Sequence, residues 1–220
     1  MILHNLNLLS SDPAEFVRLL IVTVISLTIA ITVHEFSHAY VAFRCGDDTA
    51  RRLGRMSLNP IVHLDPMGTL LLLLAGFGWG KPVPINSNYL RPPIRLSMAA
   101  VSVAGVFSNL LLALIIALPF RLSLISYNDS FLIMLLIFTL QINVILAIFN
   151  LLPFPPLDGF NILSAALPGR LMRPLAPAIK WGPFLFLGIL VMDNLLPTNI
   201  LGTVIGWPVD QITGALLGIG

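Results

Sequence analysis

The feature that most constrains this chain is a set of long apolar stretches separated by short segments that carry most of its charges. The first runs from about residue 16 to residue 43, and two more cover about 96–119 and 131–152. A helix rises about 1.5 Å per residue, so stretches of more than about 20 residues can cross a bilayer core about 30 Å thick. Only 10% of the residues are charged, compared with about 25% in soluble domains. The pattern therefore predicts an all-α polytopic membrane protein.

Three further apolar segments complete the chain. Residues 67–80 are too short to span comfortably, since a helix of that length reaches only about 21 Å, and glycines weaken it further. We expect a re-entrant or β-hairpin element there, with its backbone shielded by protein or lining a cavity. Another span is expected at about 181–196, and the tail 197–220 is ambiguous between a span and an interfacial helix. The chain is thus predicted to form a single domain over 1–220 with about four to five transmembrane helices.

Basic residues indicate the orientation of the chain, because they are enriched in cytoplasmic loops. They gather in residues 44–66, 81–95 and 153–180, whereas residues 120–130 contain only Arg121. If the short apolar element re-enters without crossing, the three basic segments share one side and Arg121 lies on the other. We therefore expect a multi-pass inner (plasma) membrane protein with its basic segments in the cytoplasm. The N-terminus, which lacks the pattern of a cleavable signal peptide, is expected outside.

The first long apolar stretch contains the sequence His34-Glu35-Phe36-Ser37-His38. Ionisable residues inside a membrane span are costly and usually functional. Because residues four apart share a helix face, His34 and His38 can both direct a ring nitrogen at one metal ion. Glu35 lies beside them and suits a general base acting on a metal-bound water. The spacing predicts a catalytic zinc site near the inner end of this span; the structural alternative is polar residues that bond to neighbouring helices.

A catalytic zinc usually has three protein ligands, so the third must come from elsewhere in the chain. Asp158 is the best candidate, because prolines stiffen the chain before it and Gly159 permits an unusual turn. It also follows the inner end of the span 131–152, at a depth similar to that of the two histidines. The alternative is a capping aspartate in a loop that ends a helix. His63 is the remaining plausible ligand, although the prolines around it predict a local turn first.

Two asparagines lie in or at the end of predicted spans. Asn109 follows a run of small residues, which allow close helix approach. Its side chain can hydrogen-bond across helices, or it can help to bind the carbonyl oxygen on which negative charge develops. Asn150 presents the same two alternatives, and the residues alone leave both open.

Together these segments resemble the site-2 protease family of intramembrane zinc metalloproteases. They occur in order over roughly residues 28–165, and the chain has neither the PDZ insert nor the CBS domain of larger members, so it looks like a compact prokaryotic form. A catalytic core of about 16–165 would then be followed by a C-terminal helical region, about 166–220. The motifs that carry the resemblance are His34 to His38, Asn59 to Pro66 followed by Gly68, Gly78 to Pro84, and Asn150 to Gly159.

The resemblance implies a zinc-dependent endopeptidase that hydrolyses peptide bonds within or near transmembrane segments of membrane-protein substrates, as in regulated intramembrane proteolysis. It implies that residues 67–86 form a membrane-associated hairpin that receives unwound substrate. The implied site residues are the Zn²⁺ ligands His34, His38 and Asp158, the catalytic base Glu35, and the substrate- or oxyanion-binding residues Asn109 and Asn150.

Two other functional classes use similar residues. A non-catalytic membrane chaperone with a structural zinc would leave no coordination position open. A zinc transporter would be expected to show an internal repeat, and the sequence has none. The single cysteine, Cys45, excludes an intrachain disulfide and a cysteine-based zinc site, and the charge distribution gives no indication of nucleic-acid binding. The substrate, its gate and the oligomeric state are not encoded in any motif that we can identify.

Overall fold

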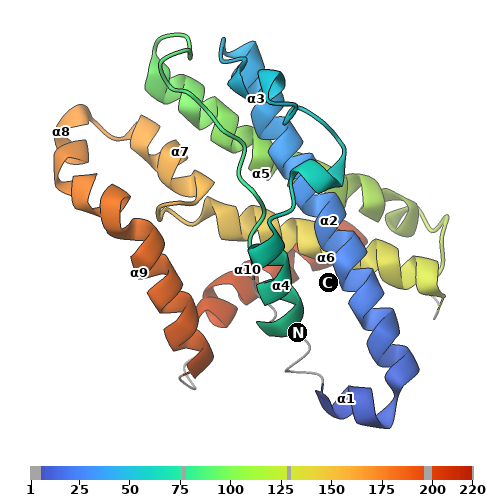
Figure 1. The fold of residues 1–220 in the computed structure, drawn as a ribbon. Helices are drawn as coiled ribbons and strands as arrows, with labels where there is room; N and C mark the ends of the chain where they lie inside the picture. Colours follow the sequence, from blue (N-terminus) through green and yellow to red (C-terminus); the bar gives the residue numbers. More distant parts are fainter. Residues whose placement is uncertain (1–5, 76–77, 128–129, 196–199, 220) are drawn as a thin grey trace.

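The computed structural model describes residues 6–75, 78–127, 130–195 and 200–219, and this part of the chain is helical, without a β-strand (Figure 1). A single isolated bridge pairs Leu64 with Gly80. The helices, in chain order, are α1 (Leu6–Ser11), α2 (Pro13–Arg44), α3 (Thr49–Arg52), η2 (Pro60–Val62), α4 (Pro66–Ala75), α5 (Ile94–Arg121), α6 (Phe131–Leu151), α7 (Asp158–Ala166), α8 (Gly169–Met172), η3 (Arg173–Leu175), α9 (Ala176–Leu195) and α10 (Ile200–Leu217).

Three helices among the described residues are long and apolar enough to cross a membrane. They are α2, α5 and α6, with mean hydropathies of 2.4, 2.4 and 2.6 over their most apolar windows. The prediction of an all-α, multi-pass membrane protein is therefore confirmed. The expected span 181–196 falls on α9 and the ambiguous tail on α10, although residues 196–199 and 220 lie outside the described part; whether α9 and α10 also span stays a prediction.

The sequence of α2 explains both its start and its orientation. Asp12 caps the helix by accepting a hydrogen bond from the Glu15 amide at 3.0 Å, and Pro13 occupies the first turn, where its missing N–H costs nothing. Along α2, residues four apart in the sequence lie on the same face of the helix. One face is exposed and fully apolar (Val17, Ile21, Ile25 and Ile29), as expected for contact with lipid. A second face, formed by Val22, Ser26, Ala30, His34 and His38, is buried.

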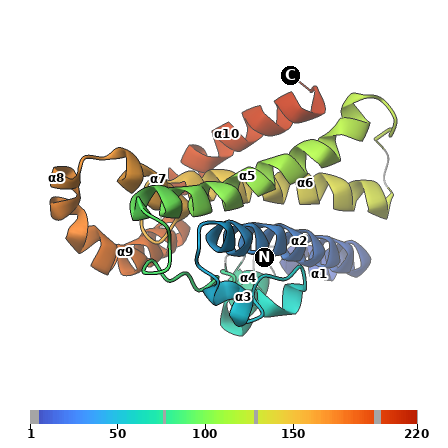
Figure 2. The same cartoon turned by 90° about the horizontal axis from the view of Figure 1, so that it is seen from above.

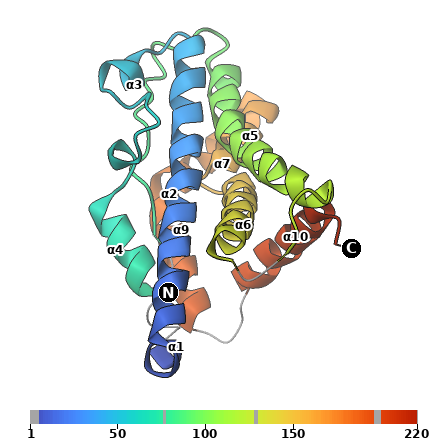
Figure 3. The same ribbon diagram turned by 90° about the vertical axis from the view of Figure 1, so that its right-hand side faces the viewer.

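The spanning helices form layers that place the histidine face in the interior. α2 packs against both α5 and α6, and α10 covers the other side of α5 and α6 (Figures 2 and 3). Small residues on α5, such as Ala113 and Ala117, allow close approach and join Leu140, Val144 and Val209 in a buried cluster. α5 and α6 therefore separate the buried face of α2 from lipid.

The short apolar segment forms a re-entrant element with one helical arm. α4 runs beside α2, and the chain returns in extended form from Gly78 (Figure 3). The bridge between Leu64 and Gly80 holds the two ends of the element together, and the backbones approach so closely that a Cβ on Gly68 would lie 2.9 Å from the Trp79 nitrogen. Entry and exit on the same side agree with the predicted re-entrant element; residues 76 and 77 lie outside the described part.

The three basic segments lie together at one end of the molecule. The Arg91 amide donates to the Cys45 carbonyl at 2.8 Å, which joins segments 44–66 and 81–95. The Arg95 guanidinium donates to the Leu167 carbonyl at 2.5 Å, which joins the third segment to the second. This arrangement agrees with the prediction that residues 67–80 do not cross the bilayer.

Candidate metal centre

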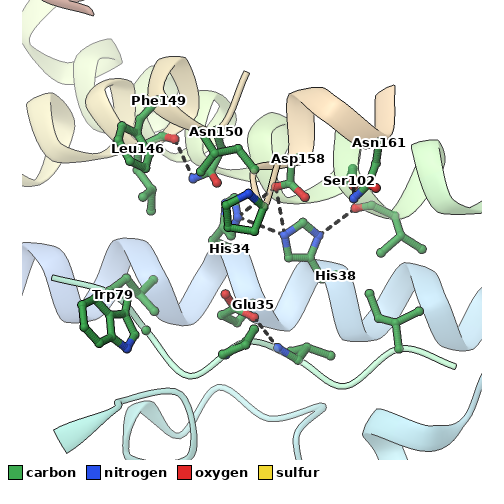
Figure 4. Close-up of a pocket in the computed structure, with 18 of the residues that line it drawn as sticks. His34, Glu35, His38, Trp79, Ser102, Leu146, Phe149, Asn150, Asp158 and Asn161 are labelled. Atoms are coloured by element: carbon green, nitrogen blue, oxygen red, sulfur yellow. Dashed lines mark hydrogen bonds and ion pairs between the residues drawn. The ribbon is translucent and has the colours of Figure 1, made fainter. Parts of the chain in front are cut away.

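Two helices bring three potential metal ligands to one point. His34 and His38 lie one turn apart on the buried face of α2, and Asp158 is the first residue of α7. The Asp158 Oδ2 atom lies 3.2 Å from His34 Nε2 and 3.1 Å from His38 Nε2, and the two Nε2 atoms are 2.9 Å apart (Figure 4). Their ligand atoms all lie within 4.8 Å of one another, so one ion can contact all three.

The donor set fits zinc. Two imidazole nitrogens and one carboxylate oxygen form one of the ligand sets found in catalytic zinc sites, which keep a further position open. Asp158 Oδ2 is buried and has no hydrogen-bond partner of good geometry, an arrangement that is costly unless an ion or proton completes it. Burial alone raises the pKa of the Asp158 carboxyl, but the neighbouring His34 and His38 lower it, and the net pKa lies well below the usual range. The lowered pKa favours the anionic form of the carboxyl, which is the form that can hold a metal ion.

Each imidazole is oriented through its other ring nitrogen. His38 Nδ1 donates to the Val101 carbonyl at 2.8 Å, and His34 Nδ1 donates to the Asn109 side-chain carbonyl at 2.6 Å. Hydrogen bonds of this kind fix the tautomer and the ring orientation of metal-binding histidines. The structure thus places Asn109 behind His34, whereas the resemblance had implied a place beside the substrate.

Gly105 of α5 supplies the space for both rings. A Cβ built on Gly105 would lie 2.6 Å from His38 Nε2 and 2.7 Å from His34 Cε1. Atoms that close must move, so no other residue fits here without displacing the ligands. Gly105 belongs to the small-residue run that the sequence identified for helix packing; its contact with the rings was not predicted.

Gly159 also allows two backbone segments to come close together, and the unusual turn predicted for it is not present. Gly159 lies inside α7, outside the left-handed backbone region. A Cβ there would lie 2.5 Å from the Leu152 carbonyl oxygen and would also meet Leu151. The end of α6 therefore packs directly on the first turn of α7, which fixes the position of Asp158.

Glu35 projects from α2 toward the extended segment that follows Gly80 (Figure 4). Its Oε2 accepts a hydrogen bond from the Val83 amide at 2.8 Å. Glu35, both histidines and Asp158 line a cleft of about 460 Å³. The apolar part of its wall includes Leu27, Ile31, Trp79, Val83, Leu146 and Phe149.

Asn150 and Asn161 add polar groups to this cleft. The Asn150 amide donates to the Leu146 carbonyl at 2.9 Å, which leaves its second N–H available. Asn161 donates to the Ser102 hydroxyl at 3.0 Å and so ties α7 to α5. The sequence analysis missed Asn161, although its position three residues after Asp158 places both on one face of a helix.

His63 lies away from the metal group. It is fully buried, and its Nε2 donates to the Ser57 carbonyl at 2.7 Å, while its own carbonyl accepts from the Lys81 amide at 2.8 Å. It therefore holds the loop before α4 against Gly80, in agreement with the local turn that its neighbouring prolines predict.

Two buried charged residues that the sequence analysis did not identify hold the extended segment in place. The Arg55 guanidinium donates to the carbonyls of Lys81 and Pro82 at 2.6 and 3.3 Å. The Asp47 carboxylate accepts from the Asn86 amide at 2.6 Å. With the Glu35 contact between them, these side chains fix the segment along α2.

Comparisons with known proteins find zinc metalloproteases among the relatives of this chain. The sequence profile of Peptidase family M50 matches residues 119–192, which include Asn150 and Asp158. The chain is 40% identical over 191 residues to a Bacillus subtilis protein named "Putative zinc metalloprotease YwhC", covering 84% of each chain. It is 29% identical over 192 residues to the protein Rip2 of Mycolicibacterium smegmatis, which carries the same description, covering 84% of this chain and 71% of that one. No solved structure matches at a comparable level of significance.

Proposed function

Because the chain belongs to peptidase family M50, the site-2 protease family, we propose that it is an endopeptidase that cuts within or near transmembrane segments of other membrane proteins. Membership makes it a zinc metalloprotease. The observation that carries the proposal is the convergence of His34, His38 and Asp158 beside Glu35, inside a layer of membrane-length helices. A soluble metalloprotease does not need to place these groups on a helix whose other face is suited to lipid.

We assign the residues as follows. His34 Nε2, His38 Nε2 and an Asp158 carboxylate oxygen hold the ion. When bound, Zn²⁺ polarises the substrate carbonyl and lowers the pKa of a water that it binds. The Glu35 carboxylate would accept the proton that the attacking water loses. The hydrogen bond from the Val83 amide holds this carboxylate at the cleft. The second N–H of Asn150 donates to the carbonyl oxygen as negative charge develops there.

The cleft suits an extended, apolar peptide. Apolar side chains from α2, α6 and the re-entrant element surround the polar groups, so a transmembrane segment can enter without exposing its side chains to water. We infer that the substrate must be unwound at the cut, because a helix closes its peptide groups in internal hydrogen bonds. Basic segments lie at the end of α2 that is nearer the site, and we infer from them that the reaction takes place near the cytoplasmic face of the plasma membrane.

The decisive variant is Glu35→Gln, which keeps the size of the side chain but removes the base. We expect zinc content to stay at the wild-type level and cleavage of a membrane-embedded substrate to fall by about 10²–10⁴-fold. Zinc is measured on purified protein, and cleavage is followed in reconstituted bilayers. The matched control is Glu15→Gln, at the exposed start of α2, which should change neither.

Retained cleavage by Glu35→Gln would contradict the assignment of the base. Wild-type protein that holds zinc tightly and cuts no membrane substrate would favour the chaperone. Zinc flux into proteoliposomes that is unaffected by Glu35→Gln would favour the transporter.

A further inference from the structure

We propose that Asn109 and Asn143 are positioning residues that fix the ring of His34 for the metal and do not contact substrate. The inference rests on the zinc site of the proposed function. Asn109 lies on α5 and Asn143 on α6, and both are fully buried among membrane-length helices. Neither side chain lines the cleft, whereas Asn150 does.

The hydrogen bonds of the two amides form a chain that leads to His34. Asn143 Nδ2 donates to the Thr139 carbonyl at 2.7 Å. Asn109 Nδ2 donates to the Asn143 side-chain oxygen at 2.7 Å and to the Ala30 carbonyl at 3.1 Å. Asn109 Oδ1 then accepts from His34 Nδ1 at 2.6 Å. Both N–H groups and the oxygen of Asn109 are thus engaged, which leaves no donor for a substrate.

This series of hydrogen bonds determines the tautomer of His34, starting from the backbone carbonyls at its other end. Backbone carbonyls can only accept, so the groups facing Thr139 and Ala30 must be amide nitrogens. The Asn143 oxygen consequently faces Asn109, and the Asn109 oxygen faces His34. Because that oxygen can only accept, His34 Nδ1 carries the proton and Nε2 keeps its lone pair toward the metal group. The orientation is set by protein groups alone.

His34 needs this support more than His38 does. His38 bonds to a backbone carbonyl, whose direction is fixed by α5. His34 bonds to a side-chain amide, which can present either its oxygen or its nitrogen, and only the oxygen leaves Nε2 able to bind a metal. Asn143 removes this ambiguity. A role limited to helix packing would require hydrogen bonds between helices but no particular orientation toward His34.

Zinc affinity and protein stability separate the two roles. In Asn109→Leu, His34 loses its acceptor, and we expect the affinity for zinc to fall by about 10–100-fold. In Asn109→Asp, the acceptor remains but the donors to Ala30 and Asn143 are lost, so we expect lower stability with an affinity closer to wild type. Asn143→Leu should also lower the affinity for zinc, but by about tenfold at most, because His34 keeps its hydrogen-bond partner Asn109.

The matched control is Ser26→Ala. The Ser26 hydroxyl bonds to the Thr139 hydroxyl at 2.9 Å, so it also joins α2 to α6 between buried polar groups, but it does not lead to His34. We expect this variant to lose stability without losing zinc affinity. Affinity is measured by chelator competition on the full chain in bilayers, and cobalt spectra report the geometry around the ion.

The inference is overturned if Asn109→Leu binds zinc within about twofold of wild type, or if Ser26→Ala loses as much affinity. If Asn109→Leu does not fold, Asn143→Leu decides, and an unchanged affinity there overturns the inference. A wild-type chain that fails to bind zinc would instead contradict the proposed function.

Discussion

At the residue scale, the candidate metal centre is built around a position that has no side chain. Both histidine rings lie over Gly105, close enough that a Cβ would overlap them. Glycine in a helix interior costs about 1 kcal/mol relative to alanine, so α5 gives up stability of its own at this point. The benefit is the space in which the imidazoles of His34 and His38 turn toward Asp158.

Gly105→Ala should therefore separate helix stability from metal binding. We expect α5 to be as stable as before or more so, while the displaced rings lower zinc affinity by at least about tenfold. Chelator competition and thermal unfolding of the zinc-free protein give the two quantities. Gly188→Ala is the control, because a Cβ on Gly188 of α9 meets no atom within 4 Å. Equal zinc affinity in the two variants would show that the rings do not depend on the space at Gly105.

The sequence predicts those site residues whose geometry is local. His34, Glu35 and His38 follow from the helix repeat, and Asp158 follows from depth once the spans are known. The role of Asn109 cannot be predicted in this way. Its side chain could contact substrate or a histidine, and which of the two it contacts depends on how the helices pack around α5. Asn143 is one of several polar residues in α6, and only the packing of α5 on α6 connects it to His34.

At the element scale, side chains hold the extended segment from Lys81 to Asn86 against α2 and the loops around α3, and no second strand pairs with it in the described part of the chain. Arg55 binds its carbonyls at the start, Glu35 binds the Val83 amide in the middle, and Asp47 binds the Asn86 amide at the end. The prolines at positions 82 and 84 have no N–H to offer a partner strand. The placement of Glu35 in the cleft thus depends on anchors at both ends of the segment.

Asp47→Ala should release the far end of this segment. Asp47 is fully buried and also accepts hydrogen bonds from the Thr49 amide at 3.0 Å and from the Thr49 hydroxyl. Its removal therefore leaves three partly buried donors without their acceptor, and a fully buried donor left unpaired costs about 1–3 kcal/mol. We expect faster hydrogen exchange of the Asn86 and Val83 amides. The neighbouring control, Asp48→Ala, removes only an exposed ion pair with Arg52 and should leave both amides protected. Unchanged exchange in Asp47→Ala would mean that Arg55 and Glu35 suffice.

The length of residues 67–80 was enough to predict that this element does not span, because helix rise is fixed. The reason for Gly159 was predicted wrongly, since a glycine after prolines suggests a turn when its neighbours are unknown. Its actual constraint is contact with the Leu152 carbonyl at the end of α6, which depends on how two helices meet and has no signature in the local sequence.

At the scale of the whole molecule, the re-entrant element determines the topology. Its ends meet at the bridge between Leu64 and Gly80, so the chain enters α5 from the side on which it left α2. The hydrogen bonds from Arg91 to Cys45 and from Arg95 to Leu167 then gather the three basic segments. The distribution of basic residues predicts that this common side is the cytoplasmic one and that the loop after Arg121 lies on the other side.

Single cysteines placed in a Cys45→Ser background test this topology. Leu53, Ser87 and Leu171 are exposed positions in the three basic segments, and Leu124 is exposed in the loop between α5 and α6. With a membrane-impermeant thiol reagent added from outside, we expect labelling of Leu124→Cys alone in intact cells and of all four variants after permeabilisation. The physical reason is that residues 67–80 return without crossing, so the number of crossings between Leu53 and Ser87 is zero. Labelling of Ser87→Cys but not Leu53→Cys in intact cells would mean that the element spans, and it would separate Glu35 from the segment that the structure places beside it.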